Sequence, residues 1–106
     1  MARLSEVQYA VISVTATATV VAALVTGKIR VVSLFVTNTT AQTVTFKSGA
    51  AGTAVTGAMA LGALGQLTLP YNPQGWFETA AATLLELFTS GGTLVAGVIG
   101  YVQVDN

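Results

Sequence analysis

Apolar and β-branched residues recur along the chain in short runs, and glycine, asparagine, serine and proline separate these runs. Threonines alternate with alanine and valine from Thr15 to Val20, which is a period of two. Because successive side chains of a strand point to opposite faces of a sheet, this pattern predicts strands rather than helices. The longer predicted strands cover residues 7–14, 17–25, 29–37, 42–47, 66–69, 83–89 and 93–104.

The segments between these runs predict turns and short irregular elements. Residues 38–41 are expected to join 29–37 to 42–47 as a hairpin, and Ser90-Gly91-Gly92 signals a second hairpin. The glycine- and alanine-rich stretch 48–65 predicts one or two short edge strands, and the two prolines of 70–75 predict a loop. The alanine run places a helical turn at 79–86.

About eight short strands in a chain of 106 residues predict one all-β domain over 1–106, an antiparallel β-sandwich or jelly-roll-like fold. Residues 1–6 are expected to form a flexible N-terminal arm. The runs 29–37 and 93–104 are apolar at both odd and even positions. A strand with one solvated face should alternate, so a second layer or a neighbouring subunit is expected to cover the other face. Within the last strand, Gly97 and Gly100 are candidate positions for a bulge or a close approach.

The uncharged segment 9–27 has the length of a membrane span or a signal peptide. Its alternation and its β-branched residues favour two strands instead, and Glu6 precedes it where a signal peptide prefers positive charge alone. The sequence therefore predicts neither a targeting segment nor a membrane partner.

Composition narrows the range of functions. The chain is 53% hydrophobic and only 8% charged, with four basic and four acidic residues and neither cysteine nor histidine. It therefore lacks the side chains of a thiol nucleophile, a zinc finger or a Ser-His-Asp triad. Four unclustered cations would neutralise few phosphates, so no nucleic-acid partner is expected. Interfaces of permanent assemblies are depleted in charge, and the composition indicates a homo-oligomeric structural part.

No residue pattern points to catalysis or to a cofactor. Glu78 and Glu86 flank one predicted strand and would form a glycosidase-like pair only if they faced each other; solvated or ion-paired carboxylates are the favoured interpretation. The glycines between Gly49 and Gly65 lack the Lys-Ser/Thr pair of a phosphate-binding loop. We therefore expect a non-enzymatic protein without a cofactor or a metal.

Two groups of side chains are candidates for contacts with other molecules. Lys28 and Arg30 are two residues apart and project from one side of a strand, either as a contact for an acidic surface or as a charged edge that discourages strand pairing. Tyr71, Trp76 and Phe77 would form an exposed aromatic loop that stacks on a sugar or a peptide. The favoured alternative is that Trp76 closes one end of the core.

Three segments carry a resemblance to a known group of proteins: 43–49 (TVTFKSG), 70–80 (PYNPQGWFETA) and 100–104 (GYVQV). With the run of short strands, they resemble small all-β virion proteins of tailed bacteriophages. The resemblance extends over about residues 20–104, and its motifs are structural. It implies a component of the virion: a capsid decoration (cement) protein, the base of a head fibre, or a part of the tail or baseplate. No functional residues follow from it.

The resulting hypothesis is a capsid decoration protein, made in the host cytoplasm, that binds the major capsid protein on the outside of the assembled head as a homotrimer. Lys28 and Arg30, with Arg3 and Glu6 of the N-terminal arm, are the candidate capsid contacts. The alternative is a tail, baseplate or head-fibre module for host attachment that binds glycans through Tyr71, Trp76 and Phe77.

Overall fold

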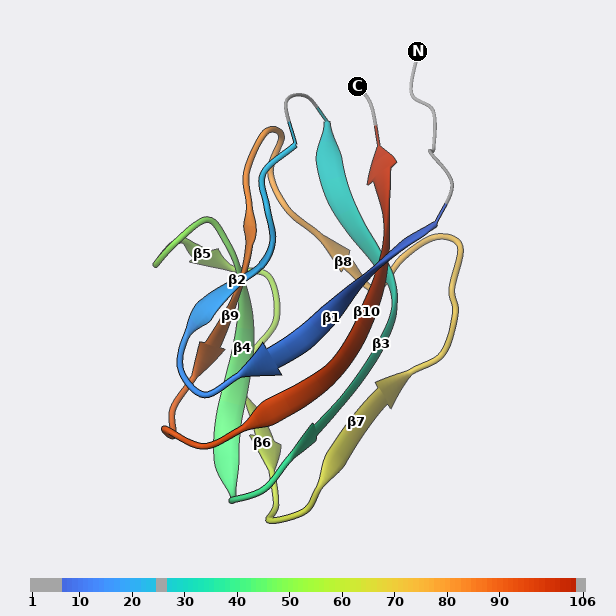
Figure 1. The fold of residues 1–106 in the computed structure, drawn as a ribbon. Coiled ribbons are helices and arrows are strands. Elements are labelled where there is room, and N and C mark those ends of the chain that lie inside the picture. The colour runs from blue at the N-terminus through green and yellow to red at the C-terminus, as the bar shows by residue number, and fades with distance from the viewer. Residues whose placement is uncertain (1–6, 25–26, 105–106) are drawn as a thin grey trace.

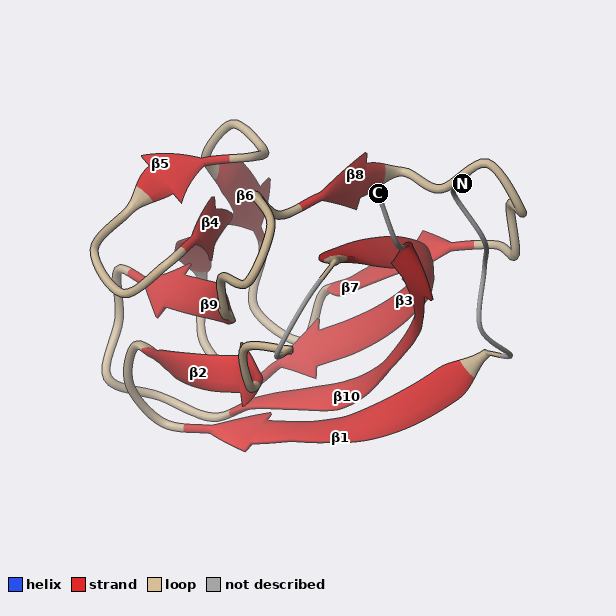
Figure 2. Cartoon of the chain, turned by 90° about the horizontal axis from the view of Figure 1, so that it is seen from above, coloured by secondary structure: helices blue, strands red, loops and turns tan. Residues whose placement is uncertain are grey.

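Two antiparallel five-stranded sheets lie face to face and form a β-sandwich (Figures 1 and 2). The computed structural model describes residues 7–24 and 27–104. Their strands are β1 (Gln8–Val14), β2 (Ala18–Val21), β3 (Lys28–Asn38), β4 (Gln42–Ser48), β5 (Thr53–Ala54), β6 (Met59–Leu61), β7 (Gln66–Leu69), β8 (Phe77–Glu78), β9 (Leu85–Thr89) and β10 (Val95–Val104).

The first sheet has the strand order β1-β10-β3-β7, and the short strand β8 also pairs with β3. The second sheet has the order β2-β9-β4-β5, and β6 pairs with the other end of β4. The chain passes from one sheet to the other at six connections: β1 to β2, β2 to β3, β3 to β4, β6 to β7, β8 to β9 and β9 to β10. With the two-residue strands β5 and β8 set aside, this is the connectivity of a jelly roll. The predicted fold class is therefore confirmed.

Both predicted hairpins are wrong for the same reason. Residues 38–41 and 90–92 do turn the chain, but each turn carries it into the opposite sheet. The two turns lie next to each other, since Thr39 N–H donates to Leu94 O and Ser90 N–H donates to Thr43 O. The residues of a turn determine that the chain reverses direction. They do not determine whether the next strand pairs with the previous one or joins the opposite sheet, which depends on where a sheet has a free edge for it.

The core lies between the sheets and contains buried aliphatic side chains from both, including Ile12, Leu34, Val44, Leu87 and Ile99. Its largest fully buried side chain is Phe46 of β4, whose ring centroid is 5.1 Å from that of Phe77 on β8. This aromatic contact joins the two sheets at the end where β8 lies.

A β-bulge in β3 changes which positions face the core. Gly100 of β10 is opposite Ser33 and Tyr101 is opposite Val31, so Val32 is an extra residue on β3. Ile29 and Val31 face the main core before the bulge, and Leu34 and Val36 face it afterwards. This shift explains why apolar residues occupy both parities of this run. The alternation expected of a strand with one solvated face is therefore interrupted at the bulge, in agreement with the apolar residues at both parities of the sequence.

Val32 itself belongs to a second, smaller apolar cluster with Val102, Val104 and Val7. Val102 alternates along β10 with Tyr101, whose side chain packs against the main core. The small cluster therefore lies on the other face of the first sheet, and both faces of β10 are partly covered within one chain.

Other predictions along the chain meet mixed outcomes. The helical turn predicted at 79–86 is wrong: Ile29 N–H donates to Thr79 Oγ1, and Ala80 N–H donates to Ser48 Oγ, so these residues are held to neighbouring strands.

The number of strands in the described residues is ten, against about eight predicted. The stretch 48–65 contains β5 and β6, as predicted, whereas β8 was not predicted. The predicted strand 17–25 is shorter, and its end at Val25 is outside the described residues.

Strands β1 and β2 occupy the uncharged segment 9–27, so the prediction of strands there is confirmed. In the part of the chain that the structure describes, no helix has the length and apolar character needed to cross a membrane. The predicted N-terminal arm, residues 1–6, is outside the described residues.

Candidate interaction surface

The outer face of the first sheet carries a row of apolar side chains across its strands. Val11 of β1 is directly opposite Val98 of β10, and Val98 is opposite Phe35 of β3. Directly opposed residues of antiparallel strands share a face. Their chain neighbours Ile12, Ile99 and Leu34 are buried in the core, so this row points away from the core.

These outward side chains are exposed to solvent. The exposed fractions are 81% for Val11, 39% for Val98 and 40% for Phe35, and Tyr9, one pleat further along β1, is 70% exposed. Tyr71, in the loop after β7, is also exposed and lines a groove with Phe35 and Val98. We call these five residues, Tyr9, Val11, Phe35, Tyr71 and Val98, the apolar face.

The groove next to Phe35 is open and has a volume of about 160 Å³. Apart from Phe35, Val98 and Tyr71, its lining residues are Ser33, Leu34, Thr68, Leu69 and Pro70. None of them is charged, and the space is suited to an apolar side chain from another molecule.

The outer face of the second sheet differs in kind. Lys47 of β4 is opposite Glu86 of β9, and the Lys47 Nζ lies 4.5 Å from the centroid of the Phe88 ring. Glu86 accepts a hydrogen bond of 3.0 Å from the Ala51 N–H and so holds the turn between β4 and β5. This face has the mixed polar character that is usual next to water, so the two outer faces of the sandwich are chemically distinct.

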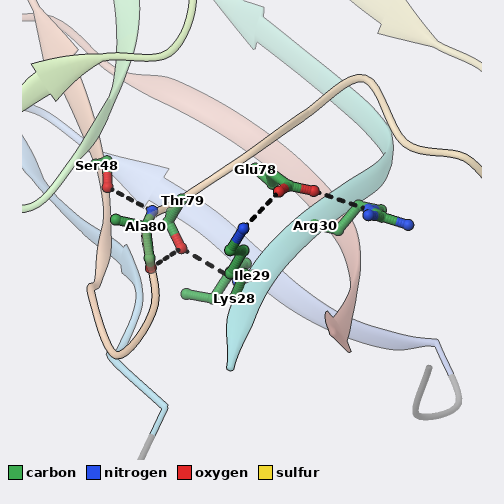
Figure 3. A network of polar contacts seen from close by, with 7 residues as sticks. All are labelled: Lys28, Ile29, Arg30, Ser48, Glu78, Thr79 and Ala80. Atoms are coloured by element: carbon green, nitrogen blue, oxygen red, sulfur yellow. Dashed lines mark hydrogen bonds and ion pairs between the residues drawn. The ribbon is translucent and has the colours of Figure 1, made fainter. Parts of the chain in front are cut away.

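Lys28 and Arg30 are brought together with Glu78 on the first sheet (Figure 3). Glu78 lies between them, 3.5 Å from Lys28 Nζ through Oε2 and 3.0 Å from Arg30 Nε through Oε1. Glu78 is on β8 directly opposite Arg30, so strand register fixes this pairing. Two cations and one carboxylate leave this group with one net positive charge.

The interpretation of Lys28 and Arg30 as a protected sheet edge is wrong, because β3 is an inner strand with β10 on one side and β8 on the other. The other candidate capsid contacts, Arg3 and Glu6, are outside the described residues. Of the four candidate capsid contacts, the structure therefore describes Lys28 and Arg30, and both form ion pairs with Glu78 of the same chain.

The three aromatic residues predicted to form one exposed loop occupy different environments. Tyr71 is 61% exposed and Trp76 is 44% exposed, whereas Phe77 packs against Phe46 and the core. The Trp76 Nε1–H donates to Pro70 O at 2.9 Å, so the indole is fixed at the surface rather than buried. The expectation that Trp76 closes the core is wrong, and Phe77 performs that role.

Glu78 and Glu86 belong to strands of different sheets and bind different partners, Lys28 and Arg30 in one case and the Ala51 N–H in the other. They do not face each other as a glycosidase pair would. Among residues 7–24 and 27–104, no group of three or more acidic side chains is arranged to hold a metal ion.

Comparison of the chain with protein-family models, with curated proteins and with solved structures finds no match. The apolar face is therefore identified as a candidate interaction surface from strand register and solvent exposure alone. Sequence reasoning did not single out Tyr9, Val11, Phe35 or Val98. The signal for them was present in the strands that are apolar at both parities, but only the register shows which of those residues remain uncovered.

Proposed function

We propose that this protein is a structural component of a bacteriophage virion, a capsid decoration protein that binds the outside of the assembled head as a homotrimer. The observation that carries the proposal is the apolar face, an exposed patch without charged side chains on the outer face of the first sheet, where the charged residues Lys28, Arg30 and Glu78 lie beyond the β3 bulge. Surfaces of this kind are typical of proteins that work in assemblies.

Two further observations support the proposal. The jelly-roll connectivity is common in viral capsid proteins, although it also occurs in lectins and enzymes, so this support is an analogy of fold. The resemblance of segments 43–49, 70–80 and 100–104 to small phage virion proteins points in the same direction.

The mechanism would be mechanical rather than chemical. A protein that binds only the expanded, assembled lattice stabilises that state by mass action, as any ligand selective for one state does. Three subunits of one trimer would bind neighbouring capsid proteins at the same time, so weak individual contacts would give a high overall affinity.

The cluster of Lys28, Arg30 and Glu78 is the proposed capsid contact in the described part of the chain, together with Arg3 and Glu6 of the N-terminal segment. Its single net positive charge and its partial exposure suit an acidic patch on the major capsid protein. The ion pairs with Glu78 hold Arg30 in one place, so less side-chain entropy would be lost on binding.

The test is cosedimentation of the purified protein with phage heads that have been stripped of decoration. The wild-type chain should sediment with expanded heads and not with unexpanded ones. Arg30→Glu should lower the occupancy at least tenfold, whereas Lys47→Glu, a matched charge reversal on the other sheet, should not change it. Equal occupancy of the Arg30→Glu variant would remove Arg30 from the contact, and no binding to heads would refute the decoration function.

Host attachment through glycan binding is the second candidate function, and the exposure of Tyr71 and Trp76 favours it. Aromatic rings at a surface stack on the apolar faces of sugars. Phe77 is excluded from such a site because it packs in the core. Titration of the protein with host-surface glycans, followed by Trp76 fluorescence, separates the two functions: saturable quenching supports attachment, and an unchanged spectrum opposes it.

A further inference from the structure

We infer that the apolar face is the surface by which copies of this chain bind one another. The inference adds to the proposed function the location of the subunit contact, and it depends on that function only for the number of subunits. It rests on the area of the face, on the charges around it and on the edge strand at its margin.

The area of the face is suited to a subunit interface. Aromatic side chains contribute about 150–250 Å² each when covered, so at the observed exposures the five residues present on the order of 500 Å² of apolar surface. A standard interface buries about 800 Å² on each partner, and about 65% of a homo-oligomeric interface is apolar. The apolar face therefore supplies about the apolar area that one subunit contributes to such an interface.

The charges favour a second copy over a charged partner. Within the described residues, the rows that cross this face carry no charged side chain, and their remaining members are small or polar: Ser13, Ser33, Thr37, Gln66, Thr68, Ala96 and Gly100. An acidic or basic partner would find no complementary charge there. Copies of the face that meet around a three-fold axis would do so without repulsion between like charges and without burying an unpaired ion.

The margin of the face formed by β1 lacks the features that usually protect an edge strand. Residues 8–14 contain no charged residue and no proline, and they pair with β10 in unbroken register without a bulge. Such an edge exposes backbone groups to another chain unless something covers it. A second copy that lies on Tyr9 and Val11 would cover this edge, and one of its apolar side chains would enter the groove beside Phe35.

The test is the mass of the full chain in solution, measured by size exclusion with light scattering. The wild type should have the mass of an oligomer, a multiple of 10.8 kDa greater than one chain. This mass should not change at high salt, because apolar contacts are not screened. Val11→Lys and Thr68→Lys place a charge on the face from two different strands, at positions that are exposed and contribute little to the core. Each variant should be mostly monomeric, with association weakened at least tenfold.

The matched control is Leu64→Lys. Leu64 is 83% exposed, against 81% for Val11, but it lies in the turn between β6 and β7. The control should keep the wild-type mass, and circular dichroism should show that all three variants are folded. A monomeric wild type, or folded Val11→Lys and Thr68→Lys variants that keep the wild-type mass, would overturn the inference.

The outcomes separate this inference from the proposed function. A wild type that binds phage heads as a monomer refutes the subunit contact and keeps the decoration function. A chain that associates through this face but binds no head refutes decoration and keeps the contact.

Discussion

The ring of Tyr9 on β1 lies over Gly100 on β10. The two residues are directly opposite in the strand register, and a Cβ atom at position 100 would be 3.1 Å from Tyr9 Cε1 and closer still to Ser33 Oγ. Gly100 also marks the point where the register with β3 shifts at the bulge. The missing side chain of Gly100 is thus replaced by the tyrosine ring from the neighbouring strand.

Gly100→Ala should lower the stability of the fold by about 1 kcal/mol, because the added methyl group must turn the Ser33 side chain and move the exposed Tyr9 ring. Thermal unfolding followed by circular dichroism measures this loss. Gly92→Ala is the control, since a Cβ there meets no atom within 4 Å. Equal melting temperatures for Gly100→Ala and the wild type would mean that the close approach does not constrain the fold.

Thr79→Val should destabilise the protein by about 1–3 kcal/mol, because it leaves the Ile29 N–H buried without an acceptor. Thr79 is 2% exposed, and its hydroxyl also donates to Ala80 O. Thr79→Ser keeps the hydroxyl and should lose less. Chemical denaturation of both variants measures the difference; a serine variant as unstable as the valine variant would contradict the role of this hydrogen bond.

Phe77→Ala should cost about 3 kcal/mol, because it opens a cavity beside Phe46 where the two sheets meet. Tyr71→Ala removes an exposed ring from the same segment and should change the stability of the fold by less than about 0.5 kcal/mol. Urea unfolding of the two variants tests whether Phe77 stabilises the fold and Tyr71 does not. Similar losses would indicate that they act as one loop cluster.

Trp76 should have a red-shifted emission spectrum and be accessible to acrylamide, because 44% of the residue is exposed. It is the only tryptophan of the chain, so the fluorescence reports on this site alone. The denatured protein provides the fully exposed reference. A blue-shifted and protected Trp76 in the native protein would mean that the indole is covered, by the core or by another molecule.

Much of the fold could be predicted from local patterns. The alternation of threonine with alanine and valine, the β-branched runs and the glycine-rich breaks predicted the longer strands and the sandwich. The glycines at 97 and 100 were identified as close-approach positions, and a Cβ at Gly97 would collide with the backbone of Phe35 and Val36. The helical turn at 79–86 failed because hydrogen bonds from Thr79 and Ala80 to distant residues outweigh the helical preference of three alanines.

Candidate residues could be proposed from the sequence only by type. Lys28 and Arg30 were identified, but their carboxylate partner Glu78 is 48 residues from Arg30 along the chain, and only the pairing of β8 with β3 brings them together. Tyr71 and Phe77 are close in the sequence and similar in chemistry. One is exposed and the other is in the core because β8 turns Phe77 toward the opposite sheet.

The sequence by itself determined that this chain is a β protein with few charges, because strand periodicity and composition are local properties of the residues. Only the tertiary structure decided which strands cross between the sheets, where β3 bulges, and that the outer face of the first sheet has an exposed apolar patch on one side of the bulge and its charged residues on the other. These features depend on contacts between residues far apart in the chain. Whether an apolar side chain is covered is decided by the strands packed next to it rather than by its own identity.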